Sequence, residues 1–322
     1  MAQGWPEMKL LISRQLPLSV MADAQAAFEV TTRPTTQPMT HDEAVVALAD
    51  YDVVLPTLGD AFRAEAFAQV PNPRCKLLAN FGVGYNHIDV DAARAAGIQV
   101  TNTPGAVTDA TADIAMTLIL MTARRAGEGE RMVRSGAWEG WHPTQMLGMH
   151  LSGKTVCVVG MGRIGQAIAR RCHFGFGCKI VYANRSAKEM DFPARQMELH
   201  DAMAAADVVA LATPGGAQTR HLIGEAELAA MNPHAILVNI SRGDVVDEAA
   251  LIGALEAGKI AGAGLDVCEF EPQVPDALKA MENVVLLPHL GTAALEVRED
   301  MGRMALANIV AFAEGRDLPN PV

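Results

Sequence analysis

The segment 158–171 reads VVGMGRIGQAIARR and places Gly160, Gly162 and Gly165 between a strand pattern and a helix pattern. In such a turn the first glycine allows a tight bend, the second lets a pyrophosphate approach the backbone, and the third lets the helix pack on the strand. The phosphates would lie at the helix N-terminus. Glycine-rich turns can also be purely structural, but the flanking strand and helix favour a dinucleotide-binding turn here.

Outward from this turn, apolar runs alternate with helical patterns along most of the chain. After the turn the predicted strands are KIVYA, DVVALAT, AILVNIS, AGAGLDV and NVVLLPH, and a final helix is expected over about 293–314. Before it, the runs KLLIS, FEVTT, DVVLPT, KLLANFG and GIQVTN alternate with helices in the same way. This alternation predicts parallel sheets. A chain of 322 residues is longer than a domain with one hydrophobic core usually is, so two domains are expected. We therefore expect an α/β protein with two Rossmann-like doubly wound domains.

Residues 126–150, AGEGERMVRSGAWEGWHPTQMLGMH, interrupt the alternation. They lose the periodicity and contain glycines, a proline and two of the three tryptophans, Trp138 and Trp141. An irregular stretch of this length in a compact protein is usually functional or reaches a partner. We therefore predict an arm over about 126–150.

The composition argues against several classes of protein. A net charge of −11 without a cluster of Lys and Arg opposes nucleic-acid binding, which depends on neutralising phosphates. Five cysteines without a C-x-x-C pair indicate neither a disulfide framework nor a zinc site, and the histidines form no metal-ligand pattern. No apolar run is long enough for a signal peptide or a membrane span. We expect a cytoplasmic protein without a metal, and no binding to nucleic acid or membrane.

Asn184, Arg185 and Ser186, in the segment YANRS, follow the second strand of the predicted dinucleotide fold. An Asp or Glu about 20 residues beyond the glycines usually binds the adenosine ribose of NAD, and none stands here. A guanidinium and a hydroxyl suit a 2′-phosphate, which a carboxylate would repel. We therefore predict a preference for NADP(H), with NAD(H) possible; the alternative is that Arg185 simply points into solvent.

Arg242 in VNISRGD, Glu271 in LDVCEFEP and His289 in VVLLPHLG each follow a predicted strand. Because open α/β sheets bind ligands outside the carboxyl ends of their strands, we expect these side chains to converge. An arginine can bind a carboxylate, a histidine can pass a proton, and a glutamate can keep that histidine protonated. Each residue alone has an ordinary structural explanation. Together they indicate acid/base chemistry on a 2-oxo acid.

In the first domain, Gly82, Val83 and Gly84 follow the strand KLLA. Their backbone N–H groups could face an anion and form a small nest for a substrate carboxylate. A plain strand-to-helix turn explains this segment equally well.

With these motifs in order, the chain resembles the D-isomer-specific 2-hydroxyacid dehydrogenases, most closely their glyoxylate/hydroxypyruvate reductase branch. The resemblance extends over nearly the whole chain and includes NFGVGYNHID, GMGRIGQAIARR, NISRGDVVDEAAL, AGLDVCEFEP and LLPHLGTA. It implies that Arg242, Glu271 and His289 are catalytic. Glu271 is preferred to Glu269 because the family's glutamate directly precedes a proline.

The resemblance also implies that the active site lies in the cleft between the two domains and reduces a small 2-oxo acid with NAD(P)H, glyoxylate or hydroxypyruvate first. Val83 and Gly84 would hold the substrate carboxylate together with Arg242 and His289. The residues implied at the cofactor are Gly160, Gly162, Arg163, Ile164, Gly165, Asn184, Arg185, Ser186, Thr213, Pro214, Ile240, Asp266 and Gly291.

For the domains, the resemblance implies that residues 1–101 begin a substrate-binding domain, that 102–290 form the dinucleotide-binding domain, and that 291–322 are a C-terminal helix returning to the first. The arm at about 126–150 would embrace a second subunit, with Trp141 directed into the neighbour's active site. This implies a homodimer.

Other functions remain open from the sequence. A phosphoglycerate dehydrogenase, or another D-2-hydroxyacid dehydrogenase, would carry the same triad, although phosphoglycerate dehydrogenases usually prefer NAD. Formate dehydrogenases have a glutamine where Glu271 stands, which argues against formate. A nucleotide-sensing protein of the corepressor type shares the fold and retains such residues, so the triad does not exclude it.

Overall fold

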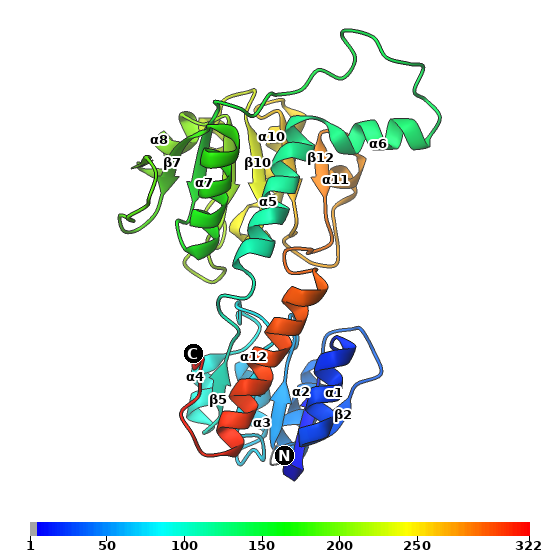
Figure 1. Ribbon diagram of the computed structural model, residues 1–322, viewed down its shortest axis with the longest axis vertical. Coiled ribbons are helices and arrows are strands. Elements are labelled where there is room, and N and C mark those ends of the chain that lie inside the picture. The colour runs from blue at the N-terminus through cyan, green and yellow to red at the C-terminus, as the bar shows by residue number, and fades with distance from the viewer. Residues whose placement is uncertain (1–4) are drawn as a thin grey trace. The chain divides into compact units, whose positions relative to one another are not determined.

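The computed structural model describes residues 5–322, which divide into two compact units. Unit 1 comprises the chain up to Val107 together with Ala293–Val322, and unit 2 is Thr108–Thr292. The sequence-based divisions were placed after residues 101 and 290. Each unit is a parallel sheet with helices, which confirms the α/β fold class (Figure 1).

Unit 1 is built on a five-stranded sheet with the order β2-β1-β3-β4-β5. Its strands are β1 (Trp5–Ile12), β2 (Phe28–Thr32), β3 (Val53–Leu55), β4 (Leu77–Ala79) and β5 (Gln99–Thr101). Its helices are α1 (Leu18–Ala27), α2 (His41–Asp50), α3 (Ala64–Gln69), α4 (Val90–Ala95) and α12 (Leu295–Ala313). Every residue of β3 and β4 is buried, as expected for parallel strands covered by helices on both faces.

Helix α12 belongs to unit 1 although the whole of unit 2 precedes it in the sequence. Its residues Ala305, Leu306 and Ile309 share a hydrophobic cluster with side chains of β1, β3, β4 and α1. The segment after α12 then pairs with β5, where the N–H of Val322 donates to the carbonyl of Val100 at 3.0 Å. Unit 1 is therefore assembled from two segments far apart in the sequence.

Unit 2 contains a seven-stranded parallel sheet with the order β12-β11-β10-β9-β6-β7-β8. The strands are β6 (Thr155–Val159), β7 (Lys179–Ala183), β8 (Ala194–Gln196), β9 (Val208–Leu211), β10 (Ile236–Asn239), β11 (Gly262–Leu265) and β12 (Val284–Leu286). The helices are α5 (Thr108–Ala123), α6 (Ala126–Arg134), α7 (Arg163–Phe176), α8 (Leu199–Ala204), α9 (Glu225–Ala230), α10 (Glu248–Glu256) and α11 (Asp276–Ala280), with a 3₁₀ turn η1 (Gly243–Val245). The strand order reverses between β6 and β9, which is the doubly wound switch point where such sheets bind ligands.

The core of unit 2 lies on both faces of its sheet. Val156 and Val158 of β6 join a hydrophobic cluster with α5 and α7, whereas Cys157 and Val159 join the opposite cluster with α8, α9 and α10. This alternation follows from the two-residue period of a strand. Helices on both faces thus bury β6 in the interior of unit 2.

The main difference from the sequence-based expectation is helix α6, because residues 126–150 were predicted to be irregular. No residue of α6 is buried, and Gly127 and Gly129 lower its helix propensity, so the sequence did not indicate a helix here. Ion pairs between Arg125 and Glu128 and between Glu130 and Arg134 support it instead. Residues 135–150 have no regular structure, and the segment projects from unit 2 beyond α6 until the N–H of Met149 donates to the carbonyl of Ala123 at 2.7 Å (Figure 1).

Two shorter elements, β8 and α11, were also not predicted. No helix in the described part of the chain, residues 5–322, is long and apolar enough to cross a membrane.

Candidate active site

The predicted functional residues of unit 2 follow strands at one edge of its sheet. Because all its strands are parallel, their carboxyl ends share that edge. The residues that follow successive strands are Gly160 after β6, Asn184 after β7, Thr213 after β9, Arg242 after β10, Asp266 after β11 and His289 after β12.

The glycine turn has the geometry that the sequence predicts. Gly160 has a φ of +93°, and a Cβ there would lie 2.8 Å from the backbone of Ala212. A Cβ on Gly165 would lie 2.0 Å from the carbonyl oxygen of Gly160. At Gly162, by contrast, no atom lies within 4 Å of where a Cβ would stand.

Gly162 is the N-cap of α7, and no side chain caps that helix. Arg163 and Ile164 begin it, so their N–H groups have no acceptor within the helix. The turn thus offers open space and backbone donors to an anion such as a pyrophosphate.

The segment after β7 joins the glycine turn through Asn184. Its Oδ1 accepts from the N–H of Met161 at 3.1 Å, and its Nδ2 donates to the carbonyl of Ser186 at 2.7 Å. Arg185 and Ser186 are exposed. The guanidinium of Arg185 donates to the side-chain carbonyl of Gln218 at 3.2 Å, so its positive charge is not balanced by that neutral partner.

The other residues predicted at the cofactor lie along the same edge. Thr213 has a buried hydroxyl without a hydrogen-bond partner among residues 5–322, and a bound ligand would supply one. Pro214 follows directly, and its carbonyl accepts from the hydroxyl of Thr219 at 2.7 Å. Ile240 is buried. The open turn, this hydroxyl and the unbalanced Arg185 fit a dinucleotide.

Asp266 has a structural task at this edge. Its carboxylate accepts from the N–H groups of Leu290 and Gly291 at 2.6 and 2.8 Å, and its carbonyl accepts from the N–H of His289 at 2.9 Å. Burial raises the pKa of Asp266 above its usual value, although these hydrogen bonds oppose the shift. Asp266 thus positions the segment that carries the histidine.

Glu271 and His289 form a direct pair. The Nδ1–H of His289 donates to Oε2 of Glu271 at 2.9 Å, and Oε1 of Glu271 accepts from the N–H of Cys268 at 3.1 Å. Burial would raise the pKa of Glu271, but the hydrogen bond and charge of His289, with the N–H of Cys268 and the charge of Arg242, hold it below the usual value. The carboxylate therefore stays ionised beside the imidazole.

His289 has a φ of +56°, which is uncommon for a residue other than glycine and is often found at functional sites. Its side chain is 29% exposed. Because Nδ1 is used by Glu271, the second ring nitrogen, Nε2, is the one that can meet a substrate.

Arg242 is placed by the turn after β10. The side chain of Asn239 donates to the carbonyl of Arg242 at 2.9 Å and accepts from the N–H of Ser241 at 3.0 Å, which fixes that turn. The stem of Arg242 lies against Gly215, where a Cβ would be 2.6 Å from Cγ of the arginine. Burial lowers the pKa of Arg242, while Glu271 and Asp244 oppose the shift.

The glycine segment in unit 1, which the sequence offered as an anion nest, is held by the side chains of two asparagines. Asn80 donates its side-chain amide to the carbonyls of Gly82 and Gly84 at 3.0 and 3.1 Å, and Asn102 donates to the carbonyl of Val83 at 2.9 Å. These hydrogen bonds fix the carbonyls of the segment that carries Val83 and Gly84, the residues predicted to bind the substrate carboxylate.

Trp141 lies on the projecting segment with 79% of its surface exposed. Within residues 5–322 no group of three or more His, Cys, Asp and Glu side chains could hold a metal ion. The five cysteines are free and buried, and burial raises the pKa of Cys75 and Cys157 to about 12, so these thiols are not nucleophiles.

Three asparagines that position the site were not predicted: Asn80, Asn102 and Asn239. A signal was present, since each ends or directly follows an apolar strand run in KLLAN, IQVTN and ILVN. An amide at a strand end can both donate and accept, and it often shapes the following turn.

A dinucleotide turn and a histidine that keeps Nε2 for a ligand, both at the carboxyl edge of one parallel sheet, suit a reaction in which a carbonyl accepts hydride at carbon and a proton at oxygen. The fold and the site define a nucleotide-dependent oxidoreductase. Similarity to known proteins identifies the family of oxidoreductases.

The family model for the D-isomer specific 2-hydroxyacid dehydrogenase NAD binding domain matches residues 116–291. The glyoxylate reductase of Thermococcus gammatolerans is 42% identical over 98% of this chain and 95% of its own. The glycerate dehydrogenase of Hyphomicrobium methylovorum is 38% identical over 96% of this chain and 97% of its own.

Among solved structures, the NADPH-dependent glyoxylate/hydroxypyruvate reductase of Sinorhizobium meliloti, in complex with NADP and malonate, is 35% identical with a TM-score of 0.86. The match covers 98% of this chain and 96% of that one. The chain belongs to the D-isomer specific 2-hydroxyacid dehydrogenase family. It is an NAD(P)-dependent enzyme of that family.

Proposed function

We propose that this enzyme reduces glyoxylate or hydroxypyruvate to the 2-hydroxy acid, with Arg242, Glu271 and His289 as its catalytic residues. The observation that carries the proposal is the 2.9 Å contact between Glu271 and Nδ1 of His289, which leaves Nε2 to act on a carbonyl oxygen. Relatives named glyoxylate reductase support the choice of substrate.

The reaction needs a hydride donor, and NAD(P)H held by the glycine turn and by Arg185 would supply the hydride to C2 of the 2-oxo acid. As the C=O electron pair moves to oxygen, His289 donates the Nε2 proton and becomes neutral. Arg242 stabilises the negative charge that develops on that oxygen and orients the substrate carboxylate. Val83 and Gly84 bind the same carboxylate through their N–H groups.

The substrate is tested by comparing kcat/KM for glyoxylate, hydroxypyruvate, pyruvate and phenylpyruvate with NADPH. Glyoxylate and hydroxypyruvate are expected to give the highest kcat/KM. Binding of the dinucleotide without turnover of any 2-oxo acid would instead indicate a nucleotide sensor.

We infer a preference for NADPH over NADH. Supporting it are the exposed Arg185, whose hydrogen-bond partner Gln218 is neutral, and the lack of a carboxylate at 184–186. A charge-assisted hydrogen bond contributes about 1.5–3 kcal/mol, so Arg185→Ala should raise KM for NADPH by roughly ten-fold or more and leave KM for NADH nearly unchanged. Initial rates with each cofactor measure this, and equal effects on both would contradict the role of Arg185.

We further propose that unit 1 binds substrate, that unit 2 binds the dinucleotide, and that the active site lies in the cleft between them, as in the family resemblance. A cytoplasmic homodimer is proposed on two supports. The cysteines are free thiols, as in a reducing compartment. The segment beyond α6 exposes apolar side chains that a second copy would cover, with Trp141 directed into the neighbour's site.

A further inference from the structure

A second pair of histidine and glutamate lies next to the first, on the same loop after β11. Oε1 of Glu269 accepts from Nε2–H of His221 at 2.7 Å and lies 3.4 Å from Nη2 of Arg220. The side chain of Glu269 is only 6% exposed, and it comes two residues before Glu271 in the sequence. A carboxylate that is this buried and this fully bonded holds its own loop in one position.

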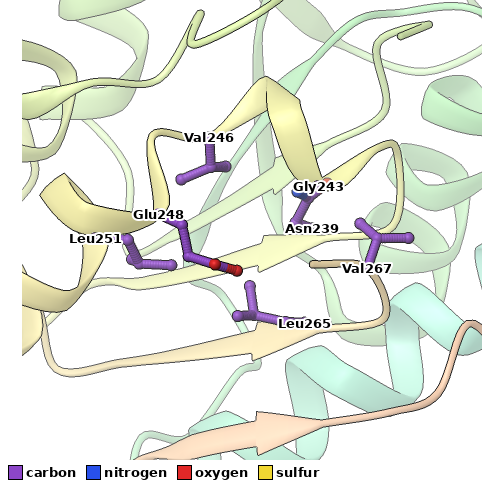
Figure 2. A pocket seen from close by; sticks show the side chains of 7 residues that line it. All are labelled: Asn239, Gly243, Val246, Glu248, Leu251, Leu265 and Val267. Carbon is purple, nitrogen blue, oxygen red and sulfur yellow. The ribbon is translucent and has the colours of Figure 1, made fainter. Parts of the chain in front are cut away.

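Glu269 is also bonded to the start of α10. Its N–H donates to Oε1 of Glu248 at 3.2 Å, and the N–H of Glu248 donates to Oε2 of Glu269 at 3.4 Å. Figure 2 shows Glu248 extending from the start of α10 into a pocket that Leu265 and Asn239 help to line. The cavity is about 10 Å³, so the carboxylate of Glu248 has little room to move.

The partner of Glu269, His221, is in turn paired with the segment that follows Arg242. The N–H of His221 donates to the carbonyl of Asp244 at 2.7 Å, and that of Ile223 to the carbonyl of Val245 at 3.0 Å. His221 has a φ of +50°, a conformation that these contacts must maintain. Charged groups facing its ring are Glu269 and, at 3.9 Å from Nδ1, Asp247.

We propose that Glu269 is a positioning residue for the reaction. It ties the loop of Glu271 to the loop of His221 and to the first turn of α10, so that Glu271 and Arg242 are held at fixed positions around His289. It does so without touching the substrate. This role rests on the proposed catalytic roles of Glu271 and His289.

The proposal is tested with Glu269→Ala, Glu269→Gln and His221→Gln in the full-length enzyme. The readouts are kcat, KM for each substrate, the pH profile of kcat/KM for glyoxylate reduction, and the melting temperature. Glu269→Ala should lower kcat about ten-fold or more, leave KM for NADPH within about three-fold, and move the fall of the pH profile toward lower pH, because Glu271 no longer stays on His289. Glu269→Gln keeps one acceptor for His221 and should lie between Ala and the parent enzyme.

His221→Gln should reproduce the effect of Glu269→Ala, and the double variant should be no worse than either single one, since the two residues act as one unit. The matched control is His200→Gln. It breaks a pair of the same type in the same unit, between His200 and Glu227 at 2.9 Å, and should leave kcat and the pH profile unchanged.

Parent-like kcat and pH profiles in folded Glu269→Ala and His221→Gln would overturn the proposal. A loss of kcat that only parallels a lower melting temperature and weaker NADPH binding would overturn it as well. If Glu269→Ala does not fold, His221→Gln and Glu269→Gln decide. If Glu271→Gln has the pH profile of the parent enzyme, the proposed catalytic function itself is wrong. If Glu271→Gln shifts the pH profile as expected but the Glu269 variants keep the parent kcat and pH profile, only the positioning role of Glu269 is wrong.

Discussion

Glu269 and Glu271 are separated by one residue, and each is hydrogen-bonded to a histidine. The two histidines, His221 and His289, differ in whether their second ring nitrogen can reach a ligand. His221 is tied through its backbone to Asp244, and its ring lies between two carboxylates. His289 bonds Glu271 through Nδ1 and is 29% exposed, so Nε2 can reach a ligand. We therefore propose that the same kind of residue pair serves structure in one place and proton transfer in the other.

Replacing Glu271 by Gln tests that difference. Without the charge, the protonated form of His289 is less favoured, so the fall of kcat/KM for reduction should move toward lower pH. At neutral pH kcat should drop about 10²-fold, the scale of one general acid. The measurement is a pH series of initial rates at saturating NADPH, and an unchanged profile would contradict the role of Glu271.

The pKa of Glu271 also gives the sign of a stability effect. Because its pKa is below the usual value in the folded protein, the ionised carboxylate stabilises the fold above the unfolded pKa, and this contribution is lost as the pH falls through the folded pKa. The melting temperatures of Glu271→Gln and the parent enzyme should therefore differ at neutral pH and converge in acid.

At the scale of the element, the loop after β9 supports the arginine on the neighbouring loop. A Cβ on Gly215 would lie 2.6 Å from Cγ of Arg242, too close for either to stay in place. Gly215→Ala should therefore displace Arg242 and lower kcat/KM roughly 10²-fold, since a shift of about 1 Å has that effect on an oriented group.

Gly253→Ala is the matched control for Gly215→Ala. Position 253 is inside α10 with no atom within 4 Å of a new Cβ, so activity should be kept and stability should rise by about 0.5–1 kcal/mol. Equal kcat/KM in the two variants would show that Gly215 does not place Arg242.

The elements that the sequence predicted best are those with a buried face. The strand runs are apolar because parallel strands are covered on both sides. The glycine turn could be recognised because side chains at Gly160 and Gly165 would clash with the backbone. Helix α6 was missed because it buries no side chain. Among site residues, Arg242, Glu271 and His289 follow strands and could be found from the sequence, whereas the bonds of Asn80, Asn102 and Glu269 depend on segments distant in the chain.

At the scale of the molecule, the projecting segment is the most exposed apolar part of unit 2. Trp138, Trp141 and Leu147 are exposed by 51, 79 and 69%. Side chains of this kind on a projecting segment are typical of a surface that another chain covers.

If a second copy covers this segment, the enzyme should elute with twice the chain mass of 34.2 kDa in light-scattering chromatography. The double change Trp138→Ser and Leu147→Ser should shift it toward the single chain. Phe174→Ser, which alters an exposed phenylalanine on α7 instead, should leave the mass doubled. A parent enzyme that elutes as one chain at tens of micromolar would contradict the homodimer.

Unit 1 is assembled from two separate segments of the chain, and this affects the order in which the protein folds during synthesis on the ribosome. Unit 2 is one continuous stretch and can fold as soon as it has emerged, whereas the sheet of unit 1 waits for α12 to cover β4 and for Val322 to pair beside β5. The first strands to be made are thus completed last. During that interval Leu77, Ala79 and their neighbours lack the cover that α12 provides, and the nascent chain exposes this apolar surface until its last residues are made.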